Sequence, residues 1–311
     1  LDVVRMKTIK IGLLGLGNIG TGTYKTLEMN RSEIESTLNA KVEIVKILER
    51  DTERDRGITV PKEKFTSDPD EIFQDPEIDI VIELLGGIEP ATTFMLSALK
   101  NGKHVVTANK AALAANYHEL INAAKENNVI LRFEASVGGG IPILGTLTGP
   151  LRANKFEEVM GILNGTTNYI LTMMTKEGLD YETALKDAQE QGFAEADPTA
   201  DVEGIDAANK LTILMALMFD KYVAPKDIPT TGITEITKEK IEEARSNGCK
   251  IKLIAHAWRD ENDEIKYEVR PMYISATHPL ANINKEFNAV FVKGNAVDDV
   301  MFYGKGAGPL P

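Results

Sequence analysis

The chain has 311 residues, 43% hydrophobic and 26% charged, which is the composition of an ordinary globular protein long enough for two domains. Its net charge of −12 argues against nucleic acid as a partner, and it shows neither a signal peptide nor an apolar run near the ~18 residues that a membrane span needs. One cysteine, Cys249, excludes an intrachain disulfide and is typical of the reducing cytoplasm; we expect it to be a buried structural residue.

The chain begins with a buried-type strand over residues 8–14, which leads into a glycine turn and then a helix. The turn has the sequence Gly15-Leu16-Gly17-Asn18-Ile19-Gly20. In this strand–turn–helix context, G-x-G-x-x-G predicts a dinucleotide-binding site. The first glycine permits the tight turn, the second lets the backbone approach the phosphates, and the third lets helix and strand pack closely. The helix N-terminus then favours the negative charge of the pyrophosphate.

Further strands alternate with helices in the first part of the chain. Helical patterns over residues 91–100 and 116–127 separate strand-like runs at 41–48, 79–85, 103–107 and 129–134. This alternation predicts a Rossmann-type α/β domain, in which a parallel sheet carries helices on both faces.

Charged residues follow the second strand as Glu49-Arg50-Asp51. An acidic residue there commonly accepts the ribose 2′-hydroxyl of NAD, whereas an arginine accommodates the 2′-phosphate of NADP. A solvated charge run is the alternative interpretation. We favour Arg50 as a phosphate-binding residue, and hence NADP over NAD.

A lysine lies just beyond another predicted strand, in the run Thr107-Ala108-Asn109-Lys110. Open α/β sheets bind ligands at this edge, so Lys110 is placed to reach a cofactor or substrate. A solvated loop lysine is the simpler alternative.

The pattern changes in the second half. Helices are predicted at 167–176, 181–191, 202–219 and 238–246, with strand-like segments at 157–163, 250–258, 265–273, 289–292 and 299–303. We therefore expect a dinucleotide-binding domain over 1–140 and an α+β domain over 141–311, built on an open mixed sheet. The glycine-rich stretch 136–142 is interpreted as a hinge. Its backbone carbonyls, together with Glu134, could also hold a hard cation.

The predicted helix over residues 202–219 carries a charged pair. Asp206 and Lys210 are four residues apart and therefore share a face. A surface pair contributing ~0.3–0.5 kcal/mol is the alternative. Residues 211–219 are apolar nearly all round, however, which indicates a buried helix. A lysine and a carboxylate at the start of such a buried helix must be paired with each other, and such groups often have a functional role.

Taken together, these segments resemble homoserine dehydrogenase. The matching runs are GLGNIG (15–20), TANKAALA (107–114), EASVGGGIPI (134–143), NGTTNYIL (164–171), GFAEADPTADVEGIDAANKLTIL (192–214) and GKGAG (304–308). The resemblance implies a cytoplasmic, NAD(P)-dependent homodimer or homotetramer. Such an enzyme interconverts L-homoserine and L-aspartate 4-semialdehyde on the aspartate-derived route to threonine, methionine and isoleucine. It also implies that residues 141–311 bind substrate and form the dimer, and that the family continues past this sequence with a helix and often a regulatory domain.

The resemblance also implies roles for individual residues. Lys210 matches the proton donor and acceptor at the substrate oxygen, and Lys110 matches a second active-site lysine near the nicotinamide. Substrate-binding positions are Glu195, Asp201, Asp206, Gly165 and Thr166. Cofactor-binding positions, besides the glycine turn and Arg50, are Thr107, Lys110 and Gly306. A sodium ion is matched by Glu134 and the carbonyls of Val137, Gly139 and Ile141.

Two alternatives belong to other classes. Another two-domain oxidoreductase, of the glucose–fructose or dihydrodipicolinate reductase kind, would not require Glu195, Asp206 and Lys210 together. A nucleotide sensor on a dinucleotide-binding fold would bind NAD(P) without turnover, and the pair of lysines argues against it.

Overall fold

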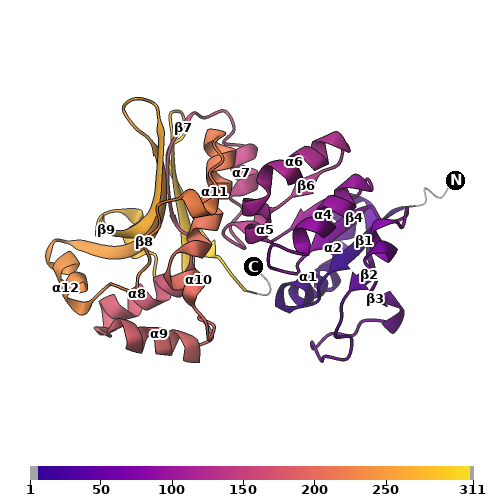
Figure 1. Ribbon diagram of the computed structural model, residues 1–311, viewed down its shortest axis with the longest axis horizontal. Helices are drawn as coiled ribbons and strands as arrows, with labels where there is room; N and C mark the ends of the chain where they lie inside the picture. Colours follow the sequence, from indigo (N-terminus) through magenta and orange to yellow (C-terminus); the bar gives the residue numbers. More distant parts are fainter. Residues whose placement is uncertain (1–5, 309–311) are drawn as a thin grey trace. The chain divides into compact units, whose positions relative to one another are not determined.

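The computed structural model describes residues 6–308, which pack as two compact units (Figure 1). The first extends to Phe133 and the second covers Glu134–Ala307. We expected residues 134–140 in the first domain, whereas in the structure they pack with the second unit. The division into a cofactor-binding and a substrate-binding domain stays a prediction. None of the helices within residues 6–308 combines the length and apolar character that a bilayer crossing requires.

The first unit is built on a six-stranded parallel sheet in the order β3-β2-β1-β4-β5-β6. This is the Rossmann order, and it reverses between β1 and β4, where such sheets bind their ligands. The expected fold class is therefore confirmed. The strands are β1 (Lys7–Leu14), β2 (Ala40–Leu48), β3 (Phe65–Thr66), β4 (Ile80–Glu83), β5 (His104–Thr107) and β6 (Leu131–Arg132).

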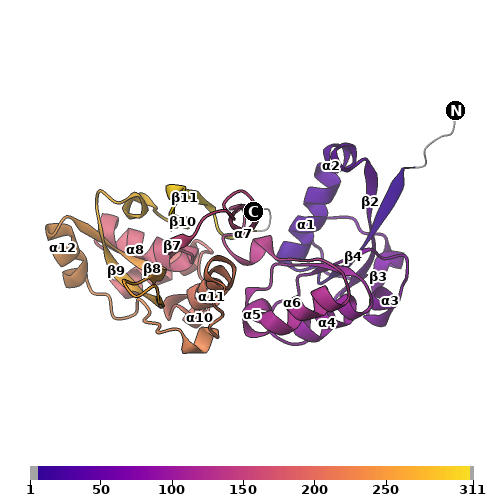
Figure 2. The same ribbon diagram turned by 90° about the horizontal axis from the view of Figure 1, so that it is seen from above.

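Helices cover both faces of this sheet. Figure 2 shows α1 and α2 on one side and α4 and α6 on the other. Leu13, Val81 and Val105 are fully buried, which is why these strands read as continuous apolar runs. The helices are α1 (Asn18–Met29), α2 (Arg31–Leu38), α3 (Asp70–Phe73), α4 (Ala91–Lys100), α5 (Lys110–Ala115) and α6 (Tyr117–Glu126), with a short 3₁₀ turn η1 (Lys62–Lys64).

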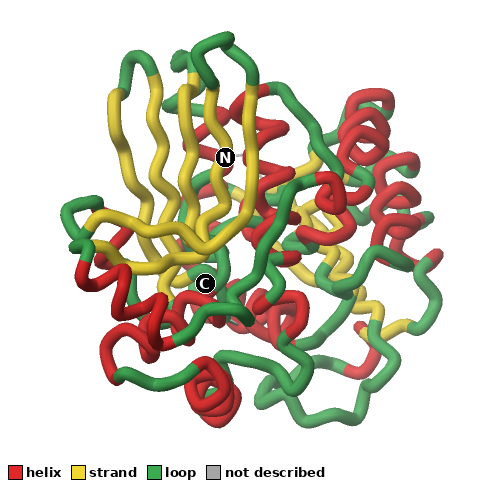
Figure 3. The backbone as a smooth tube through the Cα atoms, turned by 60° about the vertical axis from the view of Figure 1, so that its left-hand side comes forward, coloured by secondary structure: helices red, strands yellow, loops and turns green. Residues whose placement is uncertain are grey.

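The second unit contains a five-stranded sheet in the order β11-β10-β7-β8-β9. All its strand pairs are antiparallel, and a single parallel bridge joins Thr230 to Val269. Figure 3 draws strands in yellow and helices in red. The strands are β7 (Phe156–Ile162), β8 (Cys249–Arg259), β9 (Ile265–Ser275), β10 (Phe287–Gly294) and β11 (Asp298–Lys305). Its helices are α7 (Leu144–Thr148), α8 (Gly165–Glu177), α9 (Tyr181–Glu190), α10 (Thr199–Val202), α11 (Ile205–Phe219) and α12 (Lys238–Ser246), with the 3₁₀ turns η2 (Glu134–Ser136), η3 (Pro225–Asp227) and η4 (Pro279–Asn282).

Two expectations for this unit were wrong. The helix predicted over 202–219 is divided into α10 and α11, because Gly204 has a φ of +81°. A Cβ atom there would also lie 3.0 Å from Thr230 Cγ2. The division places Asp206 in the first turn of α11, where the helix dipole stabilises a carboxylate. Cys249 is partly exposed at the start of β8 rather than buried.

Candidate functional site

The glycine turn after β1 has the geometry that its sequence predicts. Gly15 has a φ of +92°, and its N–H donates to the carbonyl of Leu48 at 3.0 Å. A Cβ on Gly20 would lie 2.2 Å from the Gly15 carbonyl oxygen, so only glycine permits this approach. A Cβ on Gly17 would meet nothing within 4 Å. The backbone at Gly17 and the N-terminus of α1 are therefore open to a phosphate group.

Glu49 supports this turn from the end of β2. Its Oε2 accepts the N–H of Leu16 at 3.0 Å, and its Oε1 accepts the N–H groups of Arg50 and Asp51 at 2.8 and 3.0 Å. Burial by itself raises the pKa of Glu49, but these N–H groups and the Arg56 guanidinium lower it below its usual value. Glu49 is thus held as an anion in a structural role. Arg56 donates to the carbonyls of Leu16 and Asp51, both at 2.7 Å, and is structural too.

Arg50, in contrast, is exposed and lines a cavity of about 420 Å³. The volume is in the range of small-molecule sites. Its walls combine apolar side chains with a carboxylate, a guanidinium and a hydroxyl group. The lining includes Gly15, Glu49, Arg50, Ser67, Leu85, Pro90 and Phe94.

A buried carboxylate lies at the end of the neighbouring strand β4. Glu83 is fully buried, and its Oε2 accepts the hydroxyl of Thr107 at 2.7 Å. Thr107 ends β5, and Lys110 begins α5 three residues later. Glu83 was not among the predicted site residues. The sequence signal for it is an acidic residue at the end of the apolar run 80–82.

Lys210 and Asp206 form a buried ion pair in the second unit. Lys210 Nζ donates to Asp206 Oδ2 at 2.7 Å and to the Leu163 carbonyl at 2.6 Å. Their side chains are 9% and 8% exposed, so the surface-pair alternative is excluded. Asn164 joins the pair to a second carboxylate: its Nδ2 donates to Asp201 Oδ1 at 2.6 Å and to Asp206 Oδ2 at 2.9 Å.

This arrangement shifts the protonation of Asp201. Burial raises the pKa of Asp201, and the nearby charge of Asp206 raises it further against the lowering effect of the Asn164 amide. Asn164 itself caps α8, since its Oδ1 accepts the N–H of Thr167 at 2.9 Å. It was not among the predicted site residues, although an asparagine before a helix is a known start signal.

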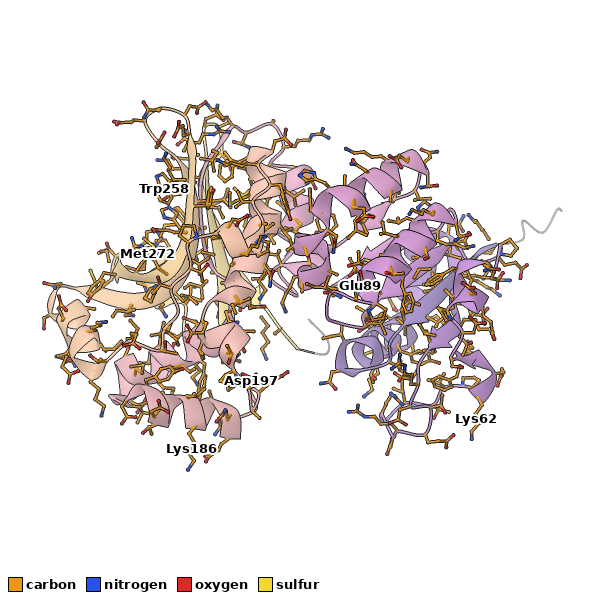
Figure 4. The ribbon with its side chains drawn as sticks, in the orientation of Figure 1. Lys62, Glu89, Lys186, Asp197, Trp258 and Met272 are labelled. Carbon is orange, nitrogen blue, oxygen red and sulfur yellow. The ribbon has the colours of Figure 1, made fainter. Side chains whose placement is uncertain are left out.

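The other predicted substrate residues differ in how they are held by the fold. Thr166 Oγ1 donates to the carbonyl of Phe193 at 2.6 Å and so ties α8 to the loop that carries Glu195. Glu195 is exposed on that loop, which Asp197 marks in Figure 4. Gly165 allows close packing, because a Cβ there would lie 2.8 Å from the Glu286 carbonyl oxygen.

The glycine-rich segment after Glu134 is tightly packed within the second unit. The Glu134 carboxylate accepts the N–H groups of Leu144 and Gly145 at 2.9 and 2.7 Å. Gly139 has a φ of +51°, and a Cβ on it would lie 2.7 Å from the Gly306 carbonyl oxygen. Within residues 6–308, no three His, Cys, Asp or Glu side chains are grouped to hold a metal ion. A cation bound here would therefore depend largely on backbone carbonyls.

Family comparisons cover nearly the whole chain. Residues 15–134 match the family model described as the NAD-binding domain of homoserine dehydrogenase. Residues 142–311 match the model described as homoserine dehydrogenase.

Individual relatives agree. The chain is 46% identical to the homoserine dehydrogenase of Bacillus subtilis and 43% identical to that of Synechocystis, covering 98% of this chain and 70% of each relative. A crystal structure of a homoserine dehydrogenase from Thiobacillus denitrificans superposes with a TM-score of 0.94 at 43% identity, over 98% of this chain and 70% of that one. A hyperthermophilic archaeal homoserine dehydrogenase in complex with NADPH has a TM-score of 0.81 at 26% identity, over 97% and 93% of the two chains.

Proposed function

Since the chain belongs to the homoserine dehydrogenase family, whose NAD(P)-dependent members interconvert L-homoserine and L-aspartate 4-semialdehyde, we propose that Lys210 moves the proton at the substrate oxygen. The observation that carries this assignment is the buried Lys210–Asp206 pair. An ammonium group has three N–H donors. Asp206 and the Leu163 carbonyl accept two of them, which leaves one for a substrate oxygen.

The two directions of the reaction follow from this geometry. When bound, NAD(P)H supplies the hydride that reduces the aldehyde carbon. Lys210 donates its third proton to the aldehyde oxygen, and in the oxidation of homoserine the neutral amine accepts the hydroxyl proton. Asp206 keeps the lysine in place in both directions.

Substrate binding is assigned to the surrounding polar groups. Homoserine carries a cationic amino group, and carboxylates are its natural partners through charge-assisted hydrogen bonds. We assign this role to Glu195 and Asp201, with Gly165 and Thr166 as the wall of the pocket. Lys110 is assigned to the cofactor's reactive end, where a cation also attracts the substrate carboxylate.

The test is an assay of NADPH formation from L-homoserine with purified protein. L-serine, which is one methylene shorter, and D-homoserine are the control substrates. Turnover should be confined to L-homoserine. Binding of NADP(H) without turnover of L-homoserine would favour the nucleotide-sensor alternative and contradict the proposal.

For the cofactor we propose a preference for NADP(H) over NAD(H). Both Glu49 and the exposed Arg50 line this cavity. Since Glu49 already accepts three backbone N–H groups and lies 3.4 Å from the Arg56 guanidinium, we assign recognition of the ribose 2′ position to Arg50. Comparison of kcat/KM for the two cofactors tests this preference.

We further propose a sodium ion at Glu134 and the carbonyls of Val137, Gly139 and Ile141. These are hard oxygen donors, as such cations require. Each Glu134 oxygen accepts one N–H and retains a lone pair, and the Ile141 carbonyl accepts one bond, from Ile143 at 2.8 Å. The thermal midpoint should rise in sodium chloride relative to choline chloride. Glu134→Gln should abolish that difference.

Self-association is proposed for the edge strand β11. Met301 and Tyr303 are 36% and 55% exposed, and alternation along the strand places them on one face. Apolar groups on an open edge strand favour pairing with another chain. We propose a homodimer or homotetramer in the cytoplasm. Sedimentation of the wild type and of Tyr303→Lys tests the assembly, because the lysine should lower the association constant.

A further inference from the structure

Glu83 is a fully buried carboxylate at the end of β4. A buried charge is costly unless its hydrogen bonds are satisfied. Here three donors meet it: Oε2 accepts the Thr107 hydroxyl at 2.7 Å, and Oε1 accepts the N–H of Leu85 at 2.8 Å and the Asn109 amide at 3.5 Å. Glu83 is not among the residues proposed to bind substrate or cofactor.

All three groups donate to the Glu83 carboxyl group. The Thr107 hydroxyl donates to Oε2 while its oxygen accepts the N–H of Asn109 at 2.9 Å. The Leu85 N–H and the Asn109 Nδ2 group can only donate. Glu83 is therefore the acceptor that these groups share.

This carboxylate joins two turns that follow neighbouring parallel strands. One is residues 84–87 after β4, and the other is residues 107–110 after β5. Asn109 completes the connection, because its Nδ2 donates to the Gly87 carbonyl at 2.7 Å. Its Oδ1 accepts the N–H of Ala112 at 3.1 Å and so caps α5, which begins at Lys110. Ligands of open α/β sheets bind at this edge.

We propose that Glu83 is a positioning residue for hydride transfer, acting through Thr107 and Lys110. The inference rests on the proposed roles of those two residues at the cofactor's reactive end. By joining both turns, Glu83 sets where the nicotinamide ring lies at this edge of the sheet. A misplacement of about 1 Å in such a geometry costs roughly 10²-fold in rate.

The first test is Glu83→Gln, which keeps the shape of the side chain. It replaces one carboxyl oxygen by an NH2 group, which would then face the donors from Thr107, Leu85 or Asn109. We expect kcat to fall by about 10–10²-fold while KM for homoserine changes less than about 2-fold. With stereospecifically deuterated NADPH, the isotope effect on kcat should increase because hydride transfer becomes slower than product release. A smaller folded fraction lowers the rate but leaves this isotope effect unchanged.

The matched control is Glu89→Gln, which removes a carboxylate from the same connection between β4 and α4. Glu89 is exposed, accepts the Thr93 hydroxyl at 2.8 Å and is labelled in Figure 4. It should retain the wild-type kcat and isotope effect. If Glu83→Gln is folded and matches this control, the proposal is overturned.

A second pair of variants changes Thr107, the donor in the hydrogen bond to Glu83. These variants test the proposal even if Glu83→Gln does not fold. Thr107→Ser keeps the hydroxyl that donates to Glu83, so its isotope effect should stay below that of Thr107→Val. Thr107→Val removes the hydroxyl and should raise the isotope effect; equal effects in the two variants overturn the proposal. Full turnover in Lys210→Ala would instead contradict the proposed proton transfer, so the two failures are distinguishable.

Discussion

Lys210 lies 2.7 Å from Asp206, one turn earlier on α11, and both side chains are buried. A buried ion pair of this kind contributes little net stability, because desolvation of both charges offsets their attraction. Removing one partner is nevertheless costly, since the other charge remains buried alone. A buried pair near the start of the apolar helix α11 is therefore better explained by the proposed proton transfer than by a gain in folding stability.

Lys210→Ala should lower kcat by ~10²–10⁴, the usual contribution of a positioned acid–base group. The Kd for NADPH should be unchanged, because the proposed role of Lys210 is proton transfer and the glycine turn belongs to the other unit. The uncompensated Asp206 should cost about 3–5 kcal/mol of folding free energy, so rates are compared at a temperature where circular dichroism shows a folded protein. Lys186→Ala, an exposed lysine on α9 labelled in Figure 4, is the control. Near-normal turnover in Lys210→Ala would contradict the proposed role of Lys210 in proton transfer.

Asp201→Asn should stabilise the protein at neutral pH. The pKa of Asp201 is raised in the folded state, by burial and by Asp206, from an ordinary value of 3.8. The folded state therefore binds this proton more tightly, and wild-type stability declines as pH rises from about 4 through the raised pKa. Asparagine avoids this loss and keeps an oxygen for Asn164.

Thermal midpoints of Asp201→Asn and of the wild type, measured as a function of pH, test whether wild-type stability declines as the pH rises. The difference should be largest near neutrality and vanish at about pH 4. KM for homoserine should rise in the variant, because a substrate ammonium loses a carboxylate partner. A midpoint difference that grows as the pH falls would contradict the argument.

Arg50→Ala should weaken NADPH binding by roughly 1.5–3 kcal/mol, the value of a charge-assisted hydrogen bond. NADH lacks the 2′-phosphate, so its Kd should barely change. Arg54→Ala removes a nearby exposed arginine and is the matched control. Equal losses for both cofactors, or none, would show that Arg50 does not bind the phosphate.

Lys252 should make stability depend on pH in the alkaline range. Burial, with smaller contributions from Lys250 and Lys176, lowers the pKa of Lys252 from 10.5 to about 7. Between these values the unfolded chain binds the proton and the folded chain does not, so wild-type stability rises with pH across this window. The Nζ atom donates to Asn168 Oδ1 at 2.9 Å and to the Ile283 carbonyl.

Urea unfolding of wild type and Lys252→Met from about pH 7 to 10 measures this effect. The free-energy difference between wild type and variant should increase over the interval. Lys186→Met, on the surface, should show no such increase. A flat difference for Lys252→Met would mean that the lysine stays charged in the folded protein.

Local signals in the sequence predicted the nucleotide turn well. Gly15, Gly17 and Gly20 act within one strand–turn–helix unit, so their spacing is sufficient to place them. The predicted Asp206–Lys210 pair is equally local, because residues four apart meet on any helix. The sequence left the charges after β2 ambiguous. Only the fold shows that Glu49 and Arg50 both line the cavity, and that Glu49 also accepts backbone N–H groups whereas the Arg50 side chain is exposed.

The partners that complete these sites come from distant positions in the chain. Asn164 meets Asp206 across 42 residues, and Thr107 meets Glu83 across 24. No periodicity in the sequence records such pairings, because they arise when strands align and helices dock on a sheet. The sequence by itself therefore determined the family, the Rossmann-type order of elements and the Asp206–Lys210 pair. Tertiary packing decided which carboxylates are buried, which accept backbone N–H groups, and which charged residues line the cavity beside the glycine turn.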